Sequence, residues 1–442
     1  MKNNNRIDFT IGAAGPLTGS LRVPGDKSIS HRALMLSAIA EGKSSIEGFL
    51  NGEDTIATMN ALRLLGVQIE QPSATLVSVE GVGLHGLSKA PEALNLGNSG
   101  TSVRLFTGLL AGQSFATELV GDASLMQRPM KRITQPLEQM GAKISCSASG
   151  TLPINIEGGV GLQGINYKMP VASAQLKSAL LLAGLYAAGK TCVMEPAVTR
   201  DHSERMLSGF GCIVERVENR ICINSQKLLA QDIQVPADIS SAAFFMVAAS
   251  IVPGSDLLLE NVGINPTRHA VIEILQVMGA SIELENVNQQ AGEPVANIRV
   301  RHSKLRGIQI PDNLVPIAID EFPVLMIAAA YAEGTTILSN AKELRVKESD
   351  RISAMCAGLE NIGVTVQEHD DGMSVDGGRV NGGTVSSYTD HRIAMAFSIA
   401  ALAAAEEITI QDCVNVNTSF PGFAEIFETM NIPITTHEVP SE

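Results

Sequence analysis

The stretch GDKSISHRALMLSAIAEG, residues 25–42, places five hydrogen-bonding side chains within six residues, directly before an apolar run. The polar group contains Lys27, Ser28 and Arg32, and the run from Ala33 to Ala40 carries no charge. A helix that is apolar nearly all round has to be buried. The stretch therefore predicts a buried helix whose polar groups gather at its N-terminal end.

The same pattern of a polar cluster followed by an Ala- and Leu-rich run returns five more times. The polar residues that open the six copies lie roughly 70 residues apart. The other copies are GNSGTSVRLFTGLLAG (97–112), VASAQLKSALLLAGLYAAG (171–189), ADISSAAFFMVAASIVPG (237–254), IDEFPVLMIAAAYAEG (319–334) and TDHRIAMAFSIAALAAAEE (389–407). Apolar helices that end at glycine are common, but six copies in constant order indicate an internal repeat.

A second pattern alternates with the first: an amphipathic helix that ends at glycine and is followed by a short strand-like run. Glycine after a helix suits the C′ position, where a positive φ costs little only for Gly or Asn. The expected C′ residues are Gly66, Gly141, Gly211, Gly279, Gly363 and Asn431. Each repeat thus has one buried helix and one outer helix, with strands between and after them.

Six α/β repeats in 442 residues predict two domains of three repeats each. Pro236 opens the fourth repeat, so we expect an N-terminal domain of residues 21–235 and a C-terminal domain that includes 236–442. Residues 1–20 precede the first repeat, and a strand among them could pair with either domain.

The composition limits the partners. The net charge of −14 argues against nucleic acid or an anionic membrane surface, although a small anion needs only a local basic pocket. The N-terminus has no apolar core of a signal peptide, and no run reaches the length of a membrane helix. Six scattered cysteines are typical of free thiols in a reducing compartment. We expect a soluble cytoplasmic protein.

Basic residues cluster at the starts of the expected helices, although a cation there opposes the helix dipole. The N-terminus of a helix also offers free N–H groups to an anion. A single such residue would be a solvated surface charge, but seven in an acidic protein predict a shared anion-binding cleft. They are Lys27, Arg32, Arg128, Arg200, Lys347, Arg351 and Arg392. Ser28 and Arg32, like Lys347 and Arg351, have the i,i+4 spacing of one helix face.

Acidic residues also lie among these cations. Asp320 and Glu321 open the fifth buried helix, and Glu348 lies within RVKESDR. A carboxylate in this position could act as a base toward a substrate hydroxyl, but Asp320 could equally be a helix cap and Glu348 an ion-pair partner. The sequence has no Walker loop, no GxGxxG after a strand and no metal-ligand spacing, so we expect neither a metal nor a cofactor. His31 is expected to be structural.

Seven strings together resemble the 5-enolpyruvylshikimate-3-phosphate (EPSP) synthase family over residues 24–397. They are PGDKSISHRA, LGNSGTSVRL, GDASLMQRPM, MPVASAQLKSALLLAG, IDEFPVLMIAAA, ELRVKESDRI and TDHRIAMAF. The resemblance implies two inside-out, barrel-like α/β domains, each with three βαβαββ-type units, joined by a double hinge. It also implies that residues 1–20 belong to the C-terminal domain and that the cleft closes on shikimate 3-phosphate and phosphoenolpyruvate.

Site residues follow from the matching motifs. The resemblance implies that shikimate 3-phosphate is bound by Lys27, Ser28, Arg32, Ser173, Ala174, Gln175, Arg200, Asp320 and Lys347. It implies that phosphoenolpyruvate is bound by Lys27, Gly100, Arg128, Gln175, Arg351 and Arg392. Asp320 would be the base for the 5-hydroxyl, and Glu348 or Lys27 would exchange the proton at C3 of phosphoenolpyruvate. The family further implies inhibition by glyphosate, and we expect a monomer.

One departure bears on the C3 proton. Many relatives have a lysine just before the C-terminal FP motif, whereas this chain reads VNVNTSFPGF, with Asn417 and Thr418. That proton shuttle is therefore missing or supplied elsewhere.

The sequence also bears on two other classes of protein. The related enolpyruvyl transferase that acts on UDP-N-acetylglucosamine has a reactive cysteine in a mobile loop, and neither Cys146 nor Cys192 has that setting. A clamp-like ring of repeated α/β units around nucleic acid needs a basic inner face, whereas the cations here lie beside carboxylates.

Overall fold

The computed structural model describes residues 6–290 and 292–439, and the chain divides into two compact units. The first unit contains the residues up to Pro24, Pro236–Asn288 and the residues from Pro294 onward. The second unit contains Gly25–Val235 and Gln289–Glu293. The chain therefore leaves the first unit after Pro24 and returns to it after Val235.

One sheet of the second unit shows the plan of the whole chain. Its first two strands are parallel and are joined by a helix, and its last strand lies antiparallel between the second and third. The elements are β6 (Leu94–Asn95), α3 (Gly100–Leu110), β7 (Thr117–Val120), α4 (Lys131–Gln139), β8 (Ile144–Ser145) and β9 (Ile154–Ile156). The order along the chain is thus β-α-β-α-β-β.

The next repeat of the second unit follows the same plan, with sheet order β10-β11-β13-β12. Its elements are β10 (Asn166–Lys168), α5 (Ala174–Gly184), β11 (Thr191–Met194), α6 (His202–Gly209), β12 (Glu215–Val217) and β13 (Arg220–Ile223). Both repeats therefore have the expected two helices with strands between and after them.

Two repeats exchange their first strands. The strand before α1 is β2, which pairs in parallel with β15 of the first unit, while β14, the strand before α7, pairs in parallel with β3 of the second unit. The elements of these repeats are β2 (Thr18–Leu21), α1 (Lys27–Ala38), β3 (Glu41–Glu47), α2 (Glu53–Leu64), β4 (Gln68–Ser73), β5 (Leu76–Val82), β14 (Ile233–Gln234), α7 (Ile239–Ile251), β15 (Asp256–Gly263), α8 (Ala270–Val277), β16 (Ser281–Gln290) and β17 (Glu293–Arg301). Each crossing segment thus completes a sheet of the unit that it is leaving.

The last two repeats lie in the first unit. In the fifth, an isolated parallel bridge between Gln309 and Ile337 stands in for the first strand. The elements are α9 (Phe322–Ala330), β18 (Thr335–Leu338), α10 (Arg351–Asn361), β19 (Thr365–His369), β20 (Gly372–Asp376), β21 (Gly383–Ser386), α11 (His391–Ala401), β22 (Ile408–Gln411), α12 (Phe423–Thr429), β23 (Ile434–Val439) and β1 (Arg6–Ile11).

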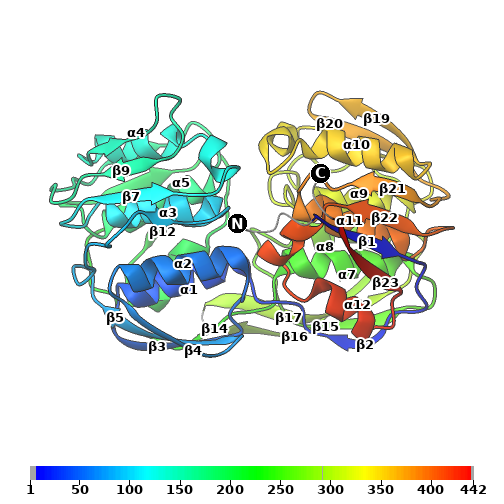
Figure 1. Ribbon diagram of the computed structural model, residues 1–442, viewed down its shortest axis with the longest axis horizontal. Coiled ribbons are helices and arrows are strands. Elements are labelled where there is room, and N and C mark those ends of the chain that lie inside the picture. The colour runs from blue at the N-terminus through cyan, green and yellow to red at the C-terminus, as the bar shows by residue number, and fades with distance from the viewer. Residues whose placement is uncertain (1–5, 291, 440–442) are drawn as a thin grey trace. The chain divides into compact units, whose positions relative to one another are not determined.

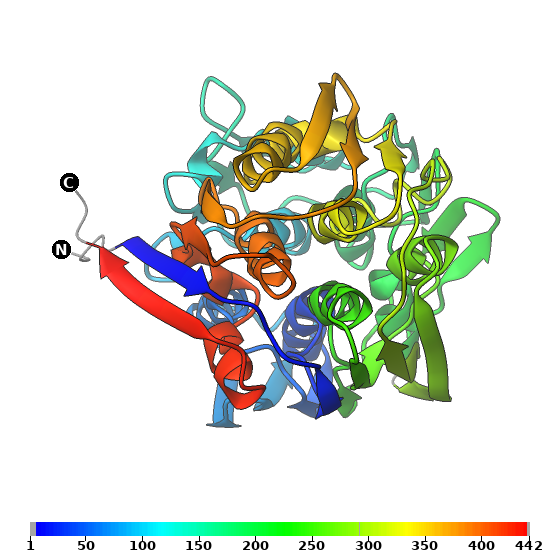
Figure 2. The same cartoon turned by 90° about the vertical axis from the view of Figure 1, so that its right-hand side faces the viewer.

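The strand near the N-terminus completes the last repeat. β1 lies antiparallel between β22 and β23, so the two ends of the described chain share one sheet (Figure 2). Both β1 and β2 therefore belong to sheets of the first unit, which settles the pairing that the sequence left open. All six sheets formed by residues 6–290 and 292–439 are open, and none closes on itself.

The first helix of each repeat is buried, as its composition predicts. In the second unit α1, α3 and α5 lie in one apolar core, with α3 and α5 side by side (Figure 1). In the first unit α7, α9 and α11 pack on one another, and Figure 2 shows them close to end-on. Every residue of α7 and α9 is buried. Each unit therefore has one core, built around three apolar helices.

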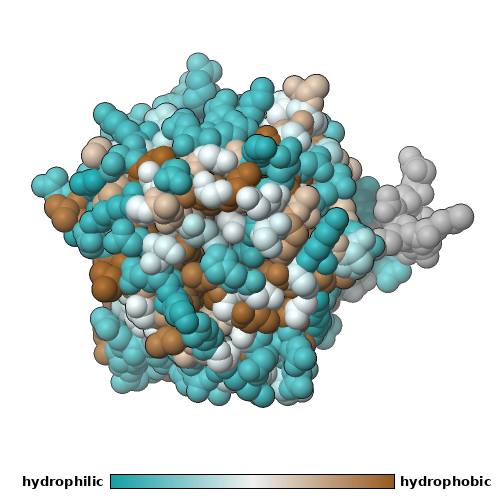
Figure 3. Space-filling view, turned by 90° about the vertical axis from the view of Figure 1, so that its left-hand side faces the viewer, coloured by the Kyte–Doolittle hydropathy of each residue, from teal (hydrophilic) through white to brown (hydrophobic). Residues whose placement is uncertain are grey.

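The outer surface is mixed in character. On the face seen in Figure 3, hydrophobic side chains form small areas separated by hydrophilic ones. In the described part of the chain, no helix is both long and apolar enough to cross a membrane.

The expected helix ends are confirmed. Gly66, Gly141, Gly211, Gly279 and Gly363 have φ between 81° and 98°, and Asn431 has φ of 57°. Each lies two residues after its helix, at C′, where an L side chain with a Cβ is strained.

One expectation about cysteines is wrong. Cys192 on β11 and Cys222 on β13 form a disulfide with a Cα–Cα distance of 4.1 Å. The two residues lie directly opposite each other in the sheet, a neighbourhood that spacing along the chain does not show. Cys146, Cys212, Cys356 and Cys413 are free thiols.

Gly211 allows the cost of a positive φ to be measured without a steric clash. Its φ is +87°, and a Cβ at this position would meet no atom within 4 Å. Gly211→Ala should destabilise the protein by about 1 kcal/mol, and Gly211→Asn by less, because Asn tolerates this conformation better. The measurement is the free energy of unfolding in urea.

Gly161→Ala is the matched control. Gly161 has open space around it and an ordinary φ, so the added methyl group should not destabilise the protein. Equal stabilities of the Gly211→Ala and Gly161→Ala variants would contradict the assignment of Gly211 as a strained helix end.

Candidate functional site

The start of α1 carries two of the expected cations of the second unit. Asp26 caps the helix by accepting a hydrogen bond from the N–H of Ile29 at 2.8 Å. Lys27 opens the helix, and its Nζ lies 2.6 Å from Oδ2 of Asp54 in the first turn of α2. The carboxylate offsets the unfavourable position of a cation at a helix N-terminus. It also fixes the direction of the ammonium group.

Arg32 lies one turn further along α1 and is buried. Its Nε donates to Oγ of Ser203 at 2.7 Å, its Nη2 to Oγ of Ser178 at 2.9 Å, and its Nη1 to the carbonyl of Ser28 at 2.9 Å. Burial lowers the pKa of Arg32 to about 10; the negative charges of Glu204 and Asp26 oppose this shift, and the positive charge of Arg200 adds to it. Arg32 thus stays charged near neutral pH while these three hydrogen bonds go to uncharged oxygens, which favours an anionic ligand.

The starts of α3 and α5 meet in the second unit. Gly100 opens α3, and a Cβ built on it would lie 3.1 Å from Nη1 of both Arg104 and Arg128. Arg104 Nη1 donates to Oε1 of Gln175 at 2.6 Å, and Gln175 Nε2 donates to Oγ1 of Thr101 at 3.1 Å. Two guanidinium groups therefore lie over the N-terminus of α3, and Gln175 of α5 is held beside them.

Ser173 and Ala174 form the first turn of α5. Ser173 is the N-cap, and its Oγ accepts a hydrogen bond from the N–H of Leu176 at 3.3 Å.

Arg128 follows a 3₁₀ turn (η1, Leu125–Gln127), and its Nη2 donates to Oδ1 of Asn98 at 2.7 Å. The glycine-rich GNSGT segment thus orients Arg128 as well as opening α3.

Asp320 joins the expected cations of the first unit. Its Oδ1 lies 3.5 Å from Nζ of Lys347 and 3.5 Å from Nη1 of Arg351. Glu321, and not Asp320, is the N-cap of α9. Lys347 ends a 3₁₀ turn (η2, Lys342–Val346), whereas Arg351 opens α10, so the expected shared helix face is wrong. They meet because both approach Asp320.

Arg351 is buried among carboxylates. Its Nε lies 2.8 Å from Oδ2 of Asp390, and its Nη2 lies 2.7 Å from Oε2 of Glu348. Burial alone would lower the pKa of Arg351, but the charges of Asp390, Glu348 and Asp320 raise it above its ordinary value. Burial likewise opposes the ionised form of Asp390, yet Arg351 and His391 hold its pKa below the ordinary value. The guanidinium is therefore fixed in place and permanently charged.

Arg392 on α11 reaches the start of α9. Its Nη1 donates to the carbonyl of Asp320 at 2.8 Å and lies 3.5 Å from Oε1 of Glu321. Glu321 is buried, and it also accepts a short hydrogen bond from Ser240 of α7. Arg268 donates to Oγ of Ser240 at 2.7 Å. The starts of α7, α9 and α11 are thus joined around one buried carboxylate.

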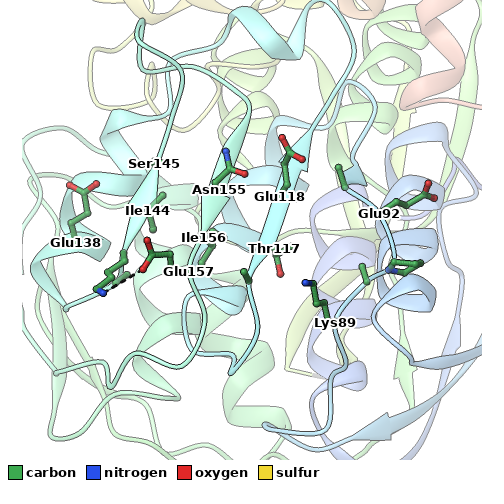
Figure 4. A pocket seen from close by; sticks show the side chains of 16 residues that line it. Lys89, Glu92, Thr117, Glu118, Glu138, Ile144, Ser145, Asn155, Ile156 and Glu157 are labelled. Carbon is green, nitrogen blue, oxygen red and sulfur yellow. Dashed lines mark ion pairs between the residues drawn. The ribbon is translucent and has the colours of Figure 1, made fainter.

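Other parts of the chain lie apart from these clusters. A pocket of about 710 Å³ in the second unit is lined by residues 89–93, by parts of β7, β8 and β9 and by neighbouring residues, including Lys89, Thr117 and Asn155 (Figure 4). None of the expected site residues lines it.

Asn417 and Thr418 lie in a 3₁₀ turn (η3, Val414–Thr418). Thr418 Oγ1 donates to the carbonyl of Asn415 at 2.7 Å, and no amine stands in this turn.

Comparison with known proteins identifies the family of the chain. The family model described as EPSP synthase (3-phosphoshikimate 1-carboxyvinyltransferase) matches residues 11–427. The chain belongs to the EPSP synthase family.

Two relatives and one solved structure illustrate the similarity to EPSP synthases. The 3-phosphoshikimate 1-carboxyvinyltransferases of Methylococcus capsulatus and Alkalilimnicola ehrlichii are 59% and 57% identical to this chain, and both alignments cover 97% of it. They cover 98% and 97% of those proteins. The EPSP synthase structure from Acinetobacter baumannii is 50% identical, with a TM-score of 0.90, and the match covers 98% of this chain and all of that one.

Within this EPSP synthase family member, the expected residues of each unit lie at connected helix starts. In the second unit they are Lys27, Ser28, Arg32, Gly100, Arg128, Ser173, Ala174, Gln175 and Arg200. In the first unit they are Asp320, Lys347, Glu348, Arg351 and Arg392.

His31 is buried, and its Nδ1 lies 2.8 Å from Oγ1 of Thr58. Burial, together with Lys27 and Arg32, holds its pKa well below the ordinary value, as suits a neutral structural residue.

Two residues of these EPSP synthase family clusters, Arg104 and Arg268, were missed by sequence reasoning. Arg104 follows Gly100 at i+4, so the spacing could have suggested it. Arg268 stands in the NPTRH segment before α8, where it resembles an ordinary cap-region charge. Only the packing of three helix starts shows that Arg268 shares Ser240 and Glu321 with Arg392.

Proposed function

We propose that this protein transfers the enolpyruvyl group of phosphoenolpyruvate to the 5-hydroxyl of shikimate 3-phosphate and releases phosphate. The observation that carries the proposal is the difference between the two clusters. Arg32 is buried and its hydrogen bonds go to uncharged oxygens, as suits a phosphate ligand, whereas Asp320 lies 3.5 Å from both Lys347 and Arg351, as suits a carboxylate that acts as a base. Family membership and the names of the relatives agree with this reaction.

Shikimate 3-phosphate is assigned mainly to the second unit. Arg32 and Arg200 supply positive charge for the phosphate, because Arg200 is near enough to lower the pKa of Arg32. Ser28, Ser173, Ala174 and Gln175 lie at the starts of α1 and α5, where hydroxyl, amide and free N–H groups suit a polyhydroxylated ring. From the first unit, Asp320 and Lys347 bind the ring hydroxyls.

Phosphoenolpyruvate is assigned to the paired arginines. Arg128 and the N–H of Gly100 bind one end of the molecule, and Arg351 and Arg392 bind its other charged groups by bidentate contacts. Lys27 and Gln175 contact both substrates. The buried carboxylates beside Arg351 and Arg392 hold the guanidinium groups in fixed directions, so little order has to be created on binding.

The reaction proceeds by addition and elimination. Asp320 accepts the proton of the 5-hydroxyl as its oxygen bonds to C2 of phosphoenolpyruvate, and Glu348 or Lys27 gives a proton to C3. The tetrahedral ketal phosphate then loses phosphate and the C3 proton, which restores the double bond. Glu348 lies 2.7 Å from Arg351, and Lys27 lies 2.6 Å from Asp54, so each has a fixed position. The proposal assigns no metal and no cofactor.

The domain organisation is part of the proposal. We assign residues 21–235 to one domain and residues 1–20 with 236–442 to the other, each an inside-out, barrel-like arrangement with helices in its centre. Three open sheets per unit and the buried α1, α3, α5 and α7, α9, α11 support this. We further propose a cytoplasmic monomer with small-molecule substrates alone.

Phosphate release with two acceptors tests the function. The protein should release phosphate from phosphoenolpyruvate when shikimate 3-phosphate is present, and not when UDP-N-acetylglucosamine replaces it. Turnover with the UDP-sugar alone would overturn the proposal. Tight binding to DNA at low salt would favour a clamp-like role instead.

Asp320→Asn tests the base. The amide keeps the size of the side chain but accepts no proton, so kcat should fall by about 100-fold or more. Shikimate 3-phosphate should still bind measurably in a calorimetric titration. Asp312→Asn, at an exposed carboxylate of the same unit, is the control and should leave kcat unchanged. Full turnover by the Asp320→Asn variant would remove Asp320 as the base.

Gly100→Ala tests the assignment of the α3 start. We propose that glyphosate inhibits this protein by competing with phosphoenolpyruvate. The new methyl group would lie 3.1 Å from both Arg104 and Arg128, so it should raise the inhibitory concentration of glyphosate by about tenfold. Steady-state inhibition assays measure this, with Gly161→Ala as control. Equal inhibition of the variant and the unaltered protein would contradict the assignment.

A further inference from the structure

We propose that Lys177 is a positioning residue for the phosphate of shikimate 3-phosphate, an inference that rests on the proposed function. Lys177 lies on α5, and its side chain is completely buried. Its ammonium group joins Glu195 and Glu204, and through them it sets the placement of Arg200 and Ser203. Lys177 itself touches no substrate in this proposal.

The buried charge is unexpected on this helix. After Gln175, α5 otherwise consists of Leu, Ala, Ser and Gly in the core of the second unit, where an apolar side chain would pack at no electrostatic cost. Nζ of Lys177 lies 2.8 Å from Oε1 of Glu195 and 2.6 Å from Oε1 of Glu204, and both carboxylates are buried. Each buried ion loses several kcal/mol of hydration, so such a group is weak evidence for stability. A placement role explains it better.

Glu195 connects Lys177 to the segment of chain that ends just before Arg200. Thr199 Oγ1 donates a short hydrogen bond to Oε1 of Glu195, and Asn219 Nδ2 donates to the Glu195 carbonyl at 2.6 Å. Nζ of Lys177 also donates to the carbonyl of Thr199 at 3.5 Å. Both ends of the segment 195–199 are thus tied to one ammonium group. Arg200 is the next residue, so its backbone starts from a fixed point.

Glu204 leads from Lys177 to Arg32. It adjoins Ser203 on α6, whose Oγ accepts from Nε of Arg32 and donates to Oγ of Ser178 at 2.7 Å. Ser178 follows Lys177 on α5 and also accepts from Arg32. The Lys177–Glu204 pair therefore fixes α6 against α5 in the position where both serines reach the guanidinium.

Removing the ammonium group of Lys177 would leave the negative charges of Glu195 and Glu204 without their closest cation. Arg216 lies 3.8 Å from Glu195 and 3.9 Å from Glu204, and about a third of its side chain is exposed. Glu204 also lies near enough to Arg32 and Arg205 to affect their pKa values. Without Lys177, Arg216 would be the cation that the two carboxylates share, and they would repel each other more strongly. The segment before Arg200 and the start of α6 would then move apart. Both phosphate-directed arginines would lose their placement.

The test is the ratio of two affinities, measured on the full chain by titration calorimetry. Lys177→Met should weaken binding of shikimate 3-phosphate by about tenfold while binding of shikimate, which lacks the phosphate, changes little. General damage to the fold would weaken both ligands alike. The pattern of one affected and one unaffected ligand therefore separates positioning from a purely structural role.

A second variant guards against unfolding. Lys177→Met combined with Glu204→Gln leaves one buried carboxylate beside Arg216, so it should regain stability without regaining the preference for the phosphorylated ligand. Lys190→Met is the matched control, because it breaks an exposed 2.6 Å ion pair with Glu215 in the same unit. It should bind both ligands as the unaltered protein does.

Two outcomes are distinct. If either Lys177 variant keeps the unaltered preference for shikimate 3-phosphate, Lys177 is not a positioning residue. If the unaltered protein binds no shikimate 3-phosphate and releases no phosphate with it, the proposed function fails, whatever the variants do.

Discussion

A helix that is apolar on every side has to be buried along its whole length, and only its ends are left to carry polar groups. In the described part of the chain six helices come close to this description, three in each unit, and they form the centre of each core, with Arg32 and Lys177 as buried charges on two of them. Their N-termini therefore gather the polar side chains that the core excludes. Their free N–H groups and dipoles favour anions at the same places. The positions of the candidate site residues follow from this one packing constraint.

The two units differ in the charges that surround the arginines at their helix starts. Around Arg32 the second unit supplies hydroxyl and carbonyl oxygens as hydrogen-bond acceptors, and burial lowers the pKa of the arginine to about 10 although Glu204 and Asp26 act in the opposite direction. Around Arg351 the first unit supplies the carboxylates of Asp390, Glu348 and Asp320, which raise its pKa. In the first arrangement no carboxylate among the described residues accepts a hydrogen bond from the guanidinium, which suits the anionic ligand proposed for it. The second holds a cation rigidly beside Asp320, the residue proposed as the base.

In both units, buried ion pairs lie next to the residues that are assigned to substrate binding. Lys177 lies behind Arg200 and Arg32, and Glu321 lies behind Arg392. Both are buried charges, so their hydration is lost and only close polar partners compensate for it. Such pairs are poor general stabilisers, but they fix directions, because each ion has few alternative partners. In both units the arginines assigned to the substrates are supported by side chains that do not themselves face a ligand.

The sequence by itself determined the features that depend on neighbours along the chain. Six buried helices, six helix ends at Gly or Asn and the cations at helix starts could all be read from spacing, because helix periodicity and backbone conformation are local properties. Tertiary structure alone decided the exchange of β2 and β14 between sheets, the Cys192–Cys222 disulfide and the meeting of Lys347 with Arg351 at Asp320. It also decided the partners of Lys177. These features join residues distant in sequence, and packing in three dimensions, which no local pattern encodes, brings them together.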